Sequence, residues 1–141
     1  MIRLPETLDA AIRAEGEKAY PNECCGVLLG RLDADGARVT EEILPIDNAR
    51  EAGEQYHRFR IEADDFLRAE HVARETGRDV LGFYHSHPDH PADPSEYDRE
   101  HALPFYSYII ISVRGGKAAE LASWELTLDR ARFEAERIVS S

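Results

Sequence analysis

Apolar residues recur at helical spacing in two parts of the chain. Residues 6–19 place Leu8, Ala11, Ile12 and Ala19 on one side, and residues 64–76 repeat such a pattern. The Tyr-Pro pair after the first stretch and the glycine after the second stop a helix. The sequence therefore predicts two long helices.

Short apolar or alternating runs between and after these helices predict strands. The runs cover residues 25–30, 37–46, 56–61, 80–84, 106–113 and 118–126. Residues 132–139 alternate as well, which favours a last edge strand, with a terminal helix as the alternative. Because strands interleave with long helices, we expect an α/β fold with a mixed sheet flanked by helices.

Length and composition favour a single domain spanning residues 1–141. The chain is 43% hydrophobic and 32% charged, as in globular proteins. No stretch approaches the ~20 apolar residues of a membrane-spanning helix, and the first residues lack the apolar run of a secretory signal. We therefore expect a cytoplasmic protein with no membrane partner.

The net charge of −11 narrows the choice of partners. It arises from 17 Lys and Arg against 28 Asp and Glu, spread along the chain. A nucleic acid would meet a repulsive field, so we expect no nucleic-acid partner. The acidic surface fits a saline cytoplasm or a basic partner equally well.

Cys24 and Cys25 are the two cysteines, and they are adjacent. A disulfide needs Cα atoms about 5.5 Å apart, whereas a trans peptide holds neighbours near 3.8 Å. We expect two small reduced side chains in a strand. A nucleophilic role for one of them is the alternative.

The densest group of candidate chemical residues lies at residues 84–98. His85 and His87 are two apart at the end of a predicted strand, so both imidazoles can point to one side. Asp93 before a proline predicts a helix N-cap, and Ser95 and Asp98 then share a face of that helix.

Two histidines and one carboxylate give the ligand count of a catalytic zinc, which keeps its fourth position for water. Each histidine alone is more often a satisfied core residue, and other side chains compete as ligands. The competitors are Asp89, His90 and Asp93; His101 is placed to orient Asp98 or to face solvent, and His57 and His71 fit structural or surface roles.

The spacing His-x-His-Pro-x6-Ser-x2-Asp resembles the signature of the JAMM (MPN-plus) zinc metalloproteases. This family also has an upstream glutamate where a glycine-bounded apolar strand begins, and Glu23 stands in that context. The similarity extends from the first predicted helix through the strand after Arg114.

The resemblance implies a cytidine-deaminase-like fold and a role for each motif residue. His85, His87 and Asp98 would bind one Zn²⁺, Glu23 would act as general base, and Ser95 would donate to the oxyanion. The Pro-Cys-x-x-Cys of the zinc deaminases is missing, so deaminase chemistry is not implied.

The resemblance also implies an activity. It is hydrolysis of the peptide or isopeptide bond after the C-terminal Gly-Gly of a ubiquitin-like or sulfur-carrier protein. Two other functions stay open: a non-catalytic scaffold of the same superfamily, and a zinc hydrolase for small amides.

Overall fold

The computed structural model describes residues 1–47 and 63–140, and every structural statement below concerns these residues. The predicted strand over residues 56–61, together with His57, lies outside them.

Eight strands form one mixed sheet in the order β7-β6-β5-β4-β2-β3-β1-β8. Antiparallel pairs join β2 to β3 and β4, whereas β4 and β5 run parallel. The strands are β1 (Ile2–Leu4), β2 (Cys25–Leu32), β3 (Arg38–Ile46), β4 (Asp79–Pro88), β5 (Ser107–Arg114), β6 (Lys117–Leu126), β7 (Phe133–Glu136) and β8 (Ile138–Ser140).

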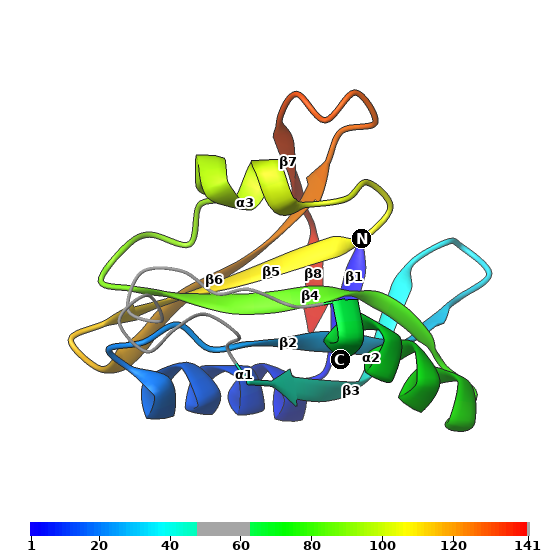
Figure 1. Cartoon of the computed structure of the whole chain (residues 1–141), viewed down its shortest axis with the longest axis horizontal. Helices are drawn as coiled ribbons and strands as arrows, with labels where there is room; N and C mark the ends of the chain where they lie inside the picture. Colours follow the sequence, from blue (N-terminus) through cyan, green and yellow to red (C-terminus); the bar gives the residue numbers. More distant parts are fainter. Residues whose placement is uncertain (48–62, 141) are drawn as a thin grey trace.

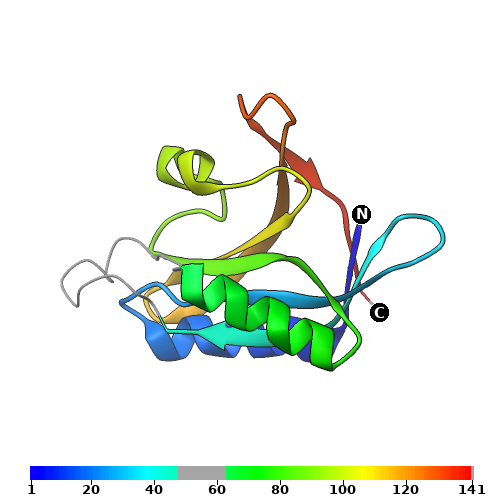
Figure 2. The same cartoon turned by 45° about the vertical axis from the view of Figure 1, so that its right-hand side comes forward.

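Three helices cover the sheet: α1 (Glu6–Ala19), α2 (Ala63–Glu75) and the short α3 (Glu96–His101). In both views α3 lies on the far side of β4 and β5 from α1 (Figures 1 and 2). Within the described ranges, no helix has the length and apolar character needed to cross a membrane. The predicted α/β architecture is confirmed.

The core forms two clusters, one on each face of the sheet. On the α1 face, Ile12 packs with Leu28 and Tyr84 from the central strands. On the other face, Ala69 of α2 packs with residues such as Phe83. Gly26 makes room for the first cluster, because a Cβ there would stand 2.2 Å from the Tyr84 ring.

The C-terminal alternation becomes two strands rather than one strand or a helix. Only Arg137 separates β7 from β8, yet these strands are the two outer members of the sheet order. The chain can connect them only if the sheet curls so that its two edges approach each other. The N-terminal strand β1, which the sequence pattern did not indicate, fills the place between β3 and β8.

A buried polar network ties the curled sheet together. The Arg38 guanidinium on β3 donates to Glu136 at 2.9 Å, to Glu125 at 2.8 Å and to Ser107 at 3.0 Å. Ser107 and Ser123 also donate to Glu136, whose side chain is fully buried. A buried carboxylate needs such partners to offset its lost hydration.

We expect Glu136→Gln to lower the free energy of unfolding by about 3 kcal/mol, because the amide NH₂ would face the Arg38 donors inside the sheet. The matched control is Glu134→Gln on the same strand, where an exposed pair with Arg132 is removed at a cost below about 1 kcal/mol. Urea unfolding measures both. Equal losses in the two variants would contradict this account of the network.

Candidate active site

The strand β4 brings two imidazoles together, as the two-residue spacing predicts. It is held between β2 and β5, with Cys25 opposite His85 and Ser112 beside His87. The two Nε2 atoms lie 3.1 Å apart, and His85 is 1% exposed. The strand ladder therefore fixes both rings at one end of the sheet.

Asp98 reaches the same point from α3 through a capping box. The Ser95 side chain accepts from the Asp98 backbone N–H at 3.1 Å, and Asp98 Oδ2 accepts from the Ser95 N–H at 2.8 Å. Ser95 is thus the N-cap and the helix begins at Glu96, so the prediction of Asp93 as N-cap was wrong. The reciprocal side-chain bonds of Ser95 and Asp98 fix the start two residues later.

The Asp98 carboxylate contacts both histidines. Its Oδ1 lies 3.2 Å from His85 Nε2, and its Oδ2 lies 3.2 Å from His87 Nε2. In a tetrahedral zinc site with bonds of about 2.0–2.1 Å, neighbouring ligand atoms stand about 3.3 Å apart. The three side chains thus have the spacing and donor types of a zinc ligand set.

Charge and burial act on these groups in opposite directions. Burial lowers the pKa of His85 and outweighs the attraction of Asp98. Burial also opposes the charged forms of His87 and Asp98. The hydrogen bond and charge of Asp98 nevertheless raise the pKa of His87. The pKa of Asp98 is lowered by the charge of His85 and by hydrogen bonds with both imidazoles and the Ser95 N–H. Asp98 is therefore ionised at neutral pH.

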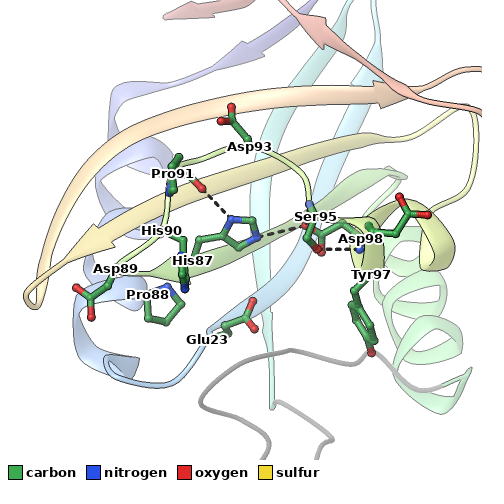
Figure 3. A pocket seen from close by; sticks show the side chains of 11 residues that line it. Glu23, His87, Pro88, Asp89, His90, Pro91, Asp93, Ser95, Tyr97 and Asp98 are labelled. Carbon is green, nitrogen blue, oxygen red and sulfur yellow. Dashed lines mark hydrogen bonds and ion pairs between the residues drawn. The ribbon is translucent and has the colours of Figure 1, made fainter.

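The backbone sets the tautomer of His87. Its Nδ1 lies 2.9 Å from the carbonyl oxygen of Pro91, which can only accept a hydrogen bond (Figure 3). Nδ1 therefore carries the proton, and neutral His87 presents the Nε2 lone pair toward Asp98 and His85. Metal-binding histidines are commonly oriented in this way.

Glu23 comes from the segment between α1 and β2. It is 5% exposed, and a carboxylate oxygen lies within 4.8 Å of ring nitrogens of His85 and His87. Next to it, the Cys24 N–H donates to Ser86 Oγ at 2.8 Å, and the Ser86 N–H donates to the Cys24 carbonyl at 3.1 Å. This pairing brings Glu23 to the two histidines.

A cavity of about 720 Å³ opens at this point (Figure 3). Five carboxylates line it, and none of its described lining residues is a Lys or Arg. The carboxylates belong to Glu23, Asp89, Asp93, Glu96 and Asp98. Ser95 is exposed at the rim of this cavity.

Among the described residues, the other candidate ligands do not share the contacts that join Asp98 to the two histidines. Asp89 accepts hydrogen bonds from Tyr20 and Gly115. His101 is exposed and stacks on Tyr97, so it does not orient Asp98. His71 pairs with Glu75 on the exposed face of α2, while His90 and Asp93 are exposed on the loop.

Two contacts of the loop after β4 were missed by sequence reasoning. Ser112 on β5 donates to the His90 carbonyl at 2.6 Å, and Trp124 Nε1 on β6 donates to the Ala92 carbonyl at 2.9 Å. These side chains hold the loop over the sheet. No sequence signal could have found them, because each bond joins residues more than 20 positions apart and ends on a backbone atom.

Both cysteines are reduced, as expected, but only Cys25 lies in a strand. Neither has the surroundings of a nucleophile. Burial raises the pKa of the Cys24 thiol to about 11, so little thiolate forms at neutral pH. Cys25 opens β2, is 1% exposed, and its pKa is also raised by burial. The nucleophilic alternative is therefore disfavoured.

The fold and this site define a small α/β domain with a histidine–carboxylate centre at the end of its sheet. Residues 5–127 match the family of prokaryotic homologs of the JAB domain, and the chain belongs to this family. The family resemblance seen in the sequence is thereby confirmed.

Two relatives carry functional names. The chain is 36% identical to the desampylase of Haloferax volcanii over 100 residues, which are 70% of this chain and 68% of the relative. It is 28% identical to the CysO-cysteine peptidase of Mycobacterium tuberculosis over 117 residues, 82% of this chain and 76% of the relative. Both names describe hydrolases.

Solved structures share the fold over almost the whole chain. A protein from Desulfitobacterium hafniense is 32% identical with a TM-score of 0.85, covering 100% of this chain and 93% of that one. A JAB1/MPN domain protein from Archaeoglobus fulgidus is 20% identical with a TM-score of 0.60, covering 99% and 94%. The second likeness bears on the fold alone.

We expect the protein to bind about one zinc per chain, because the ligand spacing suits one tetrahedral ion. Asp98→Asn should lose most of the bound metal, whereas Asp93→Asn, a matched change on the rim of the same cavity, should retain it. Metal analysis by mass spectrometry after dialysis checks both. Retention of a full equivalent by Asp98→Asn would exclude Asp98 as a ligand.

Zinc affinity should rise with pH. The pKa of His87 is raised in the metal-free protein, mainly because Asp98 outweighs burial, so below that pKa a zinc ion must displace a proton. The ion pair between His87 and Asp98 stabilises the metal-free fold at pH values below the pKa that His87 has in the unfolded chain. This stabilisation is lost as pH rises through the higher pKa that His87 has in the folded protein. The increase in Tm on adding zinc should therefore grow as pH rises above the ordinary pKa of histidine, about 6.5. His71→Gln, which changes an exposed histidine, should show the same trend, and a flat profile in the parent would contradict the assignment.

Proposed function

We propose that this protein is a zinc metallopeptidase that hydrolyses the bond after the C-terminal Gly-Gly of a ubiquitin-like or sulfur-carrier protein. One observation carries the proposal. Two imidazoles and the Asp98 carboxylate stand at ligand spacing, and a second carboxylate, Glu23, lies within 4.8 Å of the imidazole nitrogens. Metal-assisted hydrolysis needs these two kinds of group side by side.

His85, His87 and Asp98 would hold the metal. Bound there, Zn²⁺ supplies Lewis-acid chemistry, lowering the pKa of water from ~15.7 toward ~7 and polarising a carbonyl. The fixed tautomer of His87 and the capping bond to Asp98 orient these ligands before any metal arrives.

Glu23 would accept a proton from water and then donate it to the departing nitrogen. A water oxygen attacks the carbonyl carbon of the scissile bond while its proton passes to the Glu23 carboxylate. The C–N bond then breaks, and the same proton passes from Glu23 to the departing nitrogen, so the glutamate ends each turnover ionised.

Ser95 would stabilise the oxyanion of the tetrahedral intermediate. Its Oγ already accepts from the Asp98 N–H, which fixes the oxygen, and its own O–H proton stays available to donate. The residue is exposed at the rim of the cavity, where a substrate carbonyl can reach it. Loss of one such donor lowers rates about a hundred- to thousandfold.

The relatives and the cavity support the substrate class. One relative is named a desampylase and another a CysO-cysteine peptidase, which favours a protein-linked amide over a free small molecule. The described cavity wall is acidic, so a glycine tail without charged side chains enters without adding negative charge. An extended tail can bind beside a sheet edge, and a cytoplasmic location fits such partners.

We expect Glu23→Gln to bind zinc with parental stoichiometry but to lose at least about a hundredfold in kcat on a Gly-Gly-linked ubiquitin-like fusion, because no proton acceptor remains. Glu96→Gln makes the same chemical change at the rim of the same cavity and should keep kcat within about twofold. Single-turnover cleavage assays with and without a chelator measure both. Equal turnover by Glu23→Gln and the parent would exclude Glu23 as the base.

The alternatives give different results in the same assays. Failure to take up zinc after reconstitution favours the non-catalytic scaffold. Cleavage of a short acyl-dipeptide without cleavage of any ubiquitin-like fusion favours a hydrolase of small amides.

A further inference from the structure

Three connecting segments of the fold meet at the side chain of Asp89. The Tyr20 hydroxyl, which follows α1, donates to Oδ2 at 2.6 Å. The backbone N–H of Gly115, in the turn between β5 and β6, donates to Oδ1 at 2.7 Å. The Asp89 N–H itself donates to the Val113 carbonyl at 2.7 Å, so both the side chain and the backbone of this residue are held.

Asp89 and Tyr20 each lie close in sequence to a residue of the proposed active site. Asp89 comes two residues after His87, and Tyr20 comes three residues before Glu23. The hydrogen bond between them therefore joins the segment that carries the proposed base to the loop that follows the proposed ligands. Figure 3 shows Asp89 and Glu23 on the same side of the site as Pro88, beneath the His87 ring.

Glu23 is fixed from two directions. On its C-terminal side, Cys24 and Ser86 exchange two hydrogen bonds at the end of the pairing between β2 and β4. On its N-terminal side, the segment after α1 contacts the loop through Tyr20 and Asp89. Between these two anchors the backbone belongs to no helix or strand.

From this placement we infer that Tyr20 and Asp89 are positioning residues that hold Glu23 in line for proton transfer. The pair, with Gly115 as its third member, is called the Tyr20–Asp89 clasp. This inference rests on the proposed function, since it concerns the same base. The Tyr20 hydroxyl and the Asp89 carboxylate are hydrogen-bonded to each other, and the clasp acts on proton transfer through the segment that carries Glu23.

Loss of the clasp should have a measurable effect on the rate of proton transfer. A proton donor and acceptor must stand about 2.6–3.2 Å apart, and a displacement of about 1 Å can cost up to a hundredfold in rate. A segment anchored at one end samples such displacements more often than one anchored at both ends. Removal of the clasp should therefore lower kcat while leaving the ligand set and substrate affinity in place.

Tyr20→Phe is the variant that removes the hydroxyl and keeps the ring beside Gly116. We expect kcat to fall about tenfold, with KM within about twofold and zinc content unchanged. Tyr108→Phe is the matched control, because it deletes a hydroxyl that accepts from the Leu103 N–H at 2.8 Å in another loop. The control should keep its kcat even if it lowers Tm.

A double variant separates positioning from general destabilisation. If the clasp acts through Glu23, then adding Tyr20→Phe to Glu23→Gln should not reduce the residual rate further. Asp89→Asn tests the other partner, because asparagine tolerates the positive φ of 58° at this residue. A full tenfold loss in the Glu23→Gln background, or no loss in the parent background, would overturn the inference.

A second readout does not depend on hydrolysis. Cys24 follows Glu23 directly and is half-buried, whereas Cys25 is 1% exposed. In metal-free protein, Tyr20→Phe should raise the labelling rate of Cys24 by a thiol reagent severalfold, with Cys25 unlabelled and Tyr108→Phe unchanged. An unchanged Cys24 rate would show that the segment is held without the clasp.

The two readouts distinguish the two proposals. If the parent cleaves no ubiquitin-like fusion but Tyr20→Phe speeds labelling of Cys24, the proposed function fails and the anchoring of the segment stands. If the parent cleaves and Tyr20→Phe changes neither kcat nor labelling, the clasp inference alone fails.

Discussion

The structure of this site depends on one carboxylate that takes part in two arrangements at once. Asp98 closes the capping box at the start of α3 and also contacts both imidazoles. A helix of six residues has little stability of its own, so contacts at its ends decide where it begins. A second contact of α3 is made by Arg99, which donates to the Arg130 carbonyl in the hairpin between β6 and β7. The start of α3 and the geometry of the site are therefore one constraint.

Sequence reasoning reached the parts of the site that depend on local periodicity. The two-residue spacing of His85 and His87 places both rings on one face because a strand permits nothing else. Ser95 and Asp98 were expected on a shared helical face, and the capping box brings them together. The N-cap was misplaced at Asp93, because Asp-Pro and Ser-x-x-Asp are both acceptable helix starts and their N-cap positions lie two residues apart. The contact with the histidines favours the later one.

Contacts between residues far apart in the sequence could not be predicted from local sequence patterns, for a physical reason. The bonds from Trp124 to the Ala92 carbonyl and from Tyr20 to Asp89 join residues 32 and 69 positions apart. The division of the C-terminal run into β7 and β8 depends equally on the curl of the whole sheet, which the Arg38 network holds. Neither a hydrophobic period nor a turn motif encodes such curvature, so the pattern predicted strand character and missed the partner strands.

The surroundings of the Asp98 carboxylate support the role proposed for it as a ligand and not as the base. Burial alone would raise the pKa of Asp98, but the adjoining imidazoles and the Ser95 N–H reverse the effect and lower it. A carboxylate held ionised far below neutral pH is a poor proton acceptor, since proton transfer is most efficient when the pKa of the base lies near the working pH. Asp98 is thus suited to bind a cation and unsuited to shuttle protons. In the proposed mechanism the proton passes to Glu23, the other buried carboxylate close to the two imidazoles.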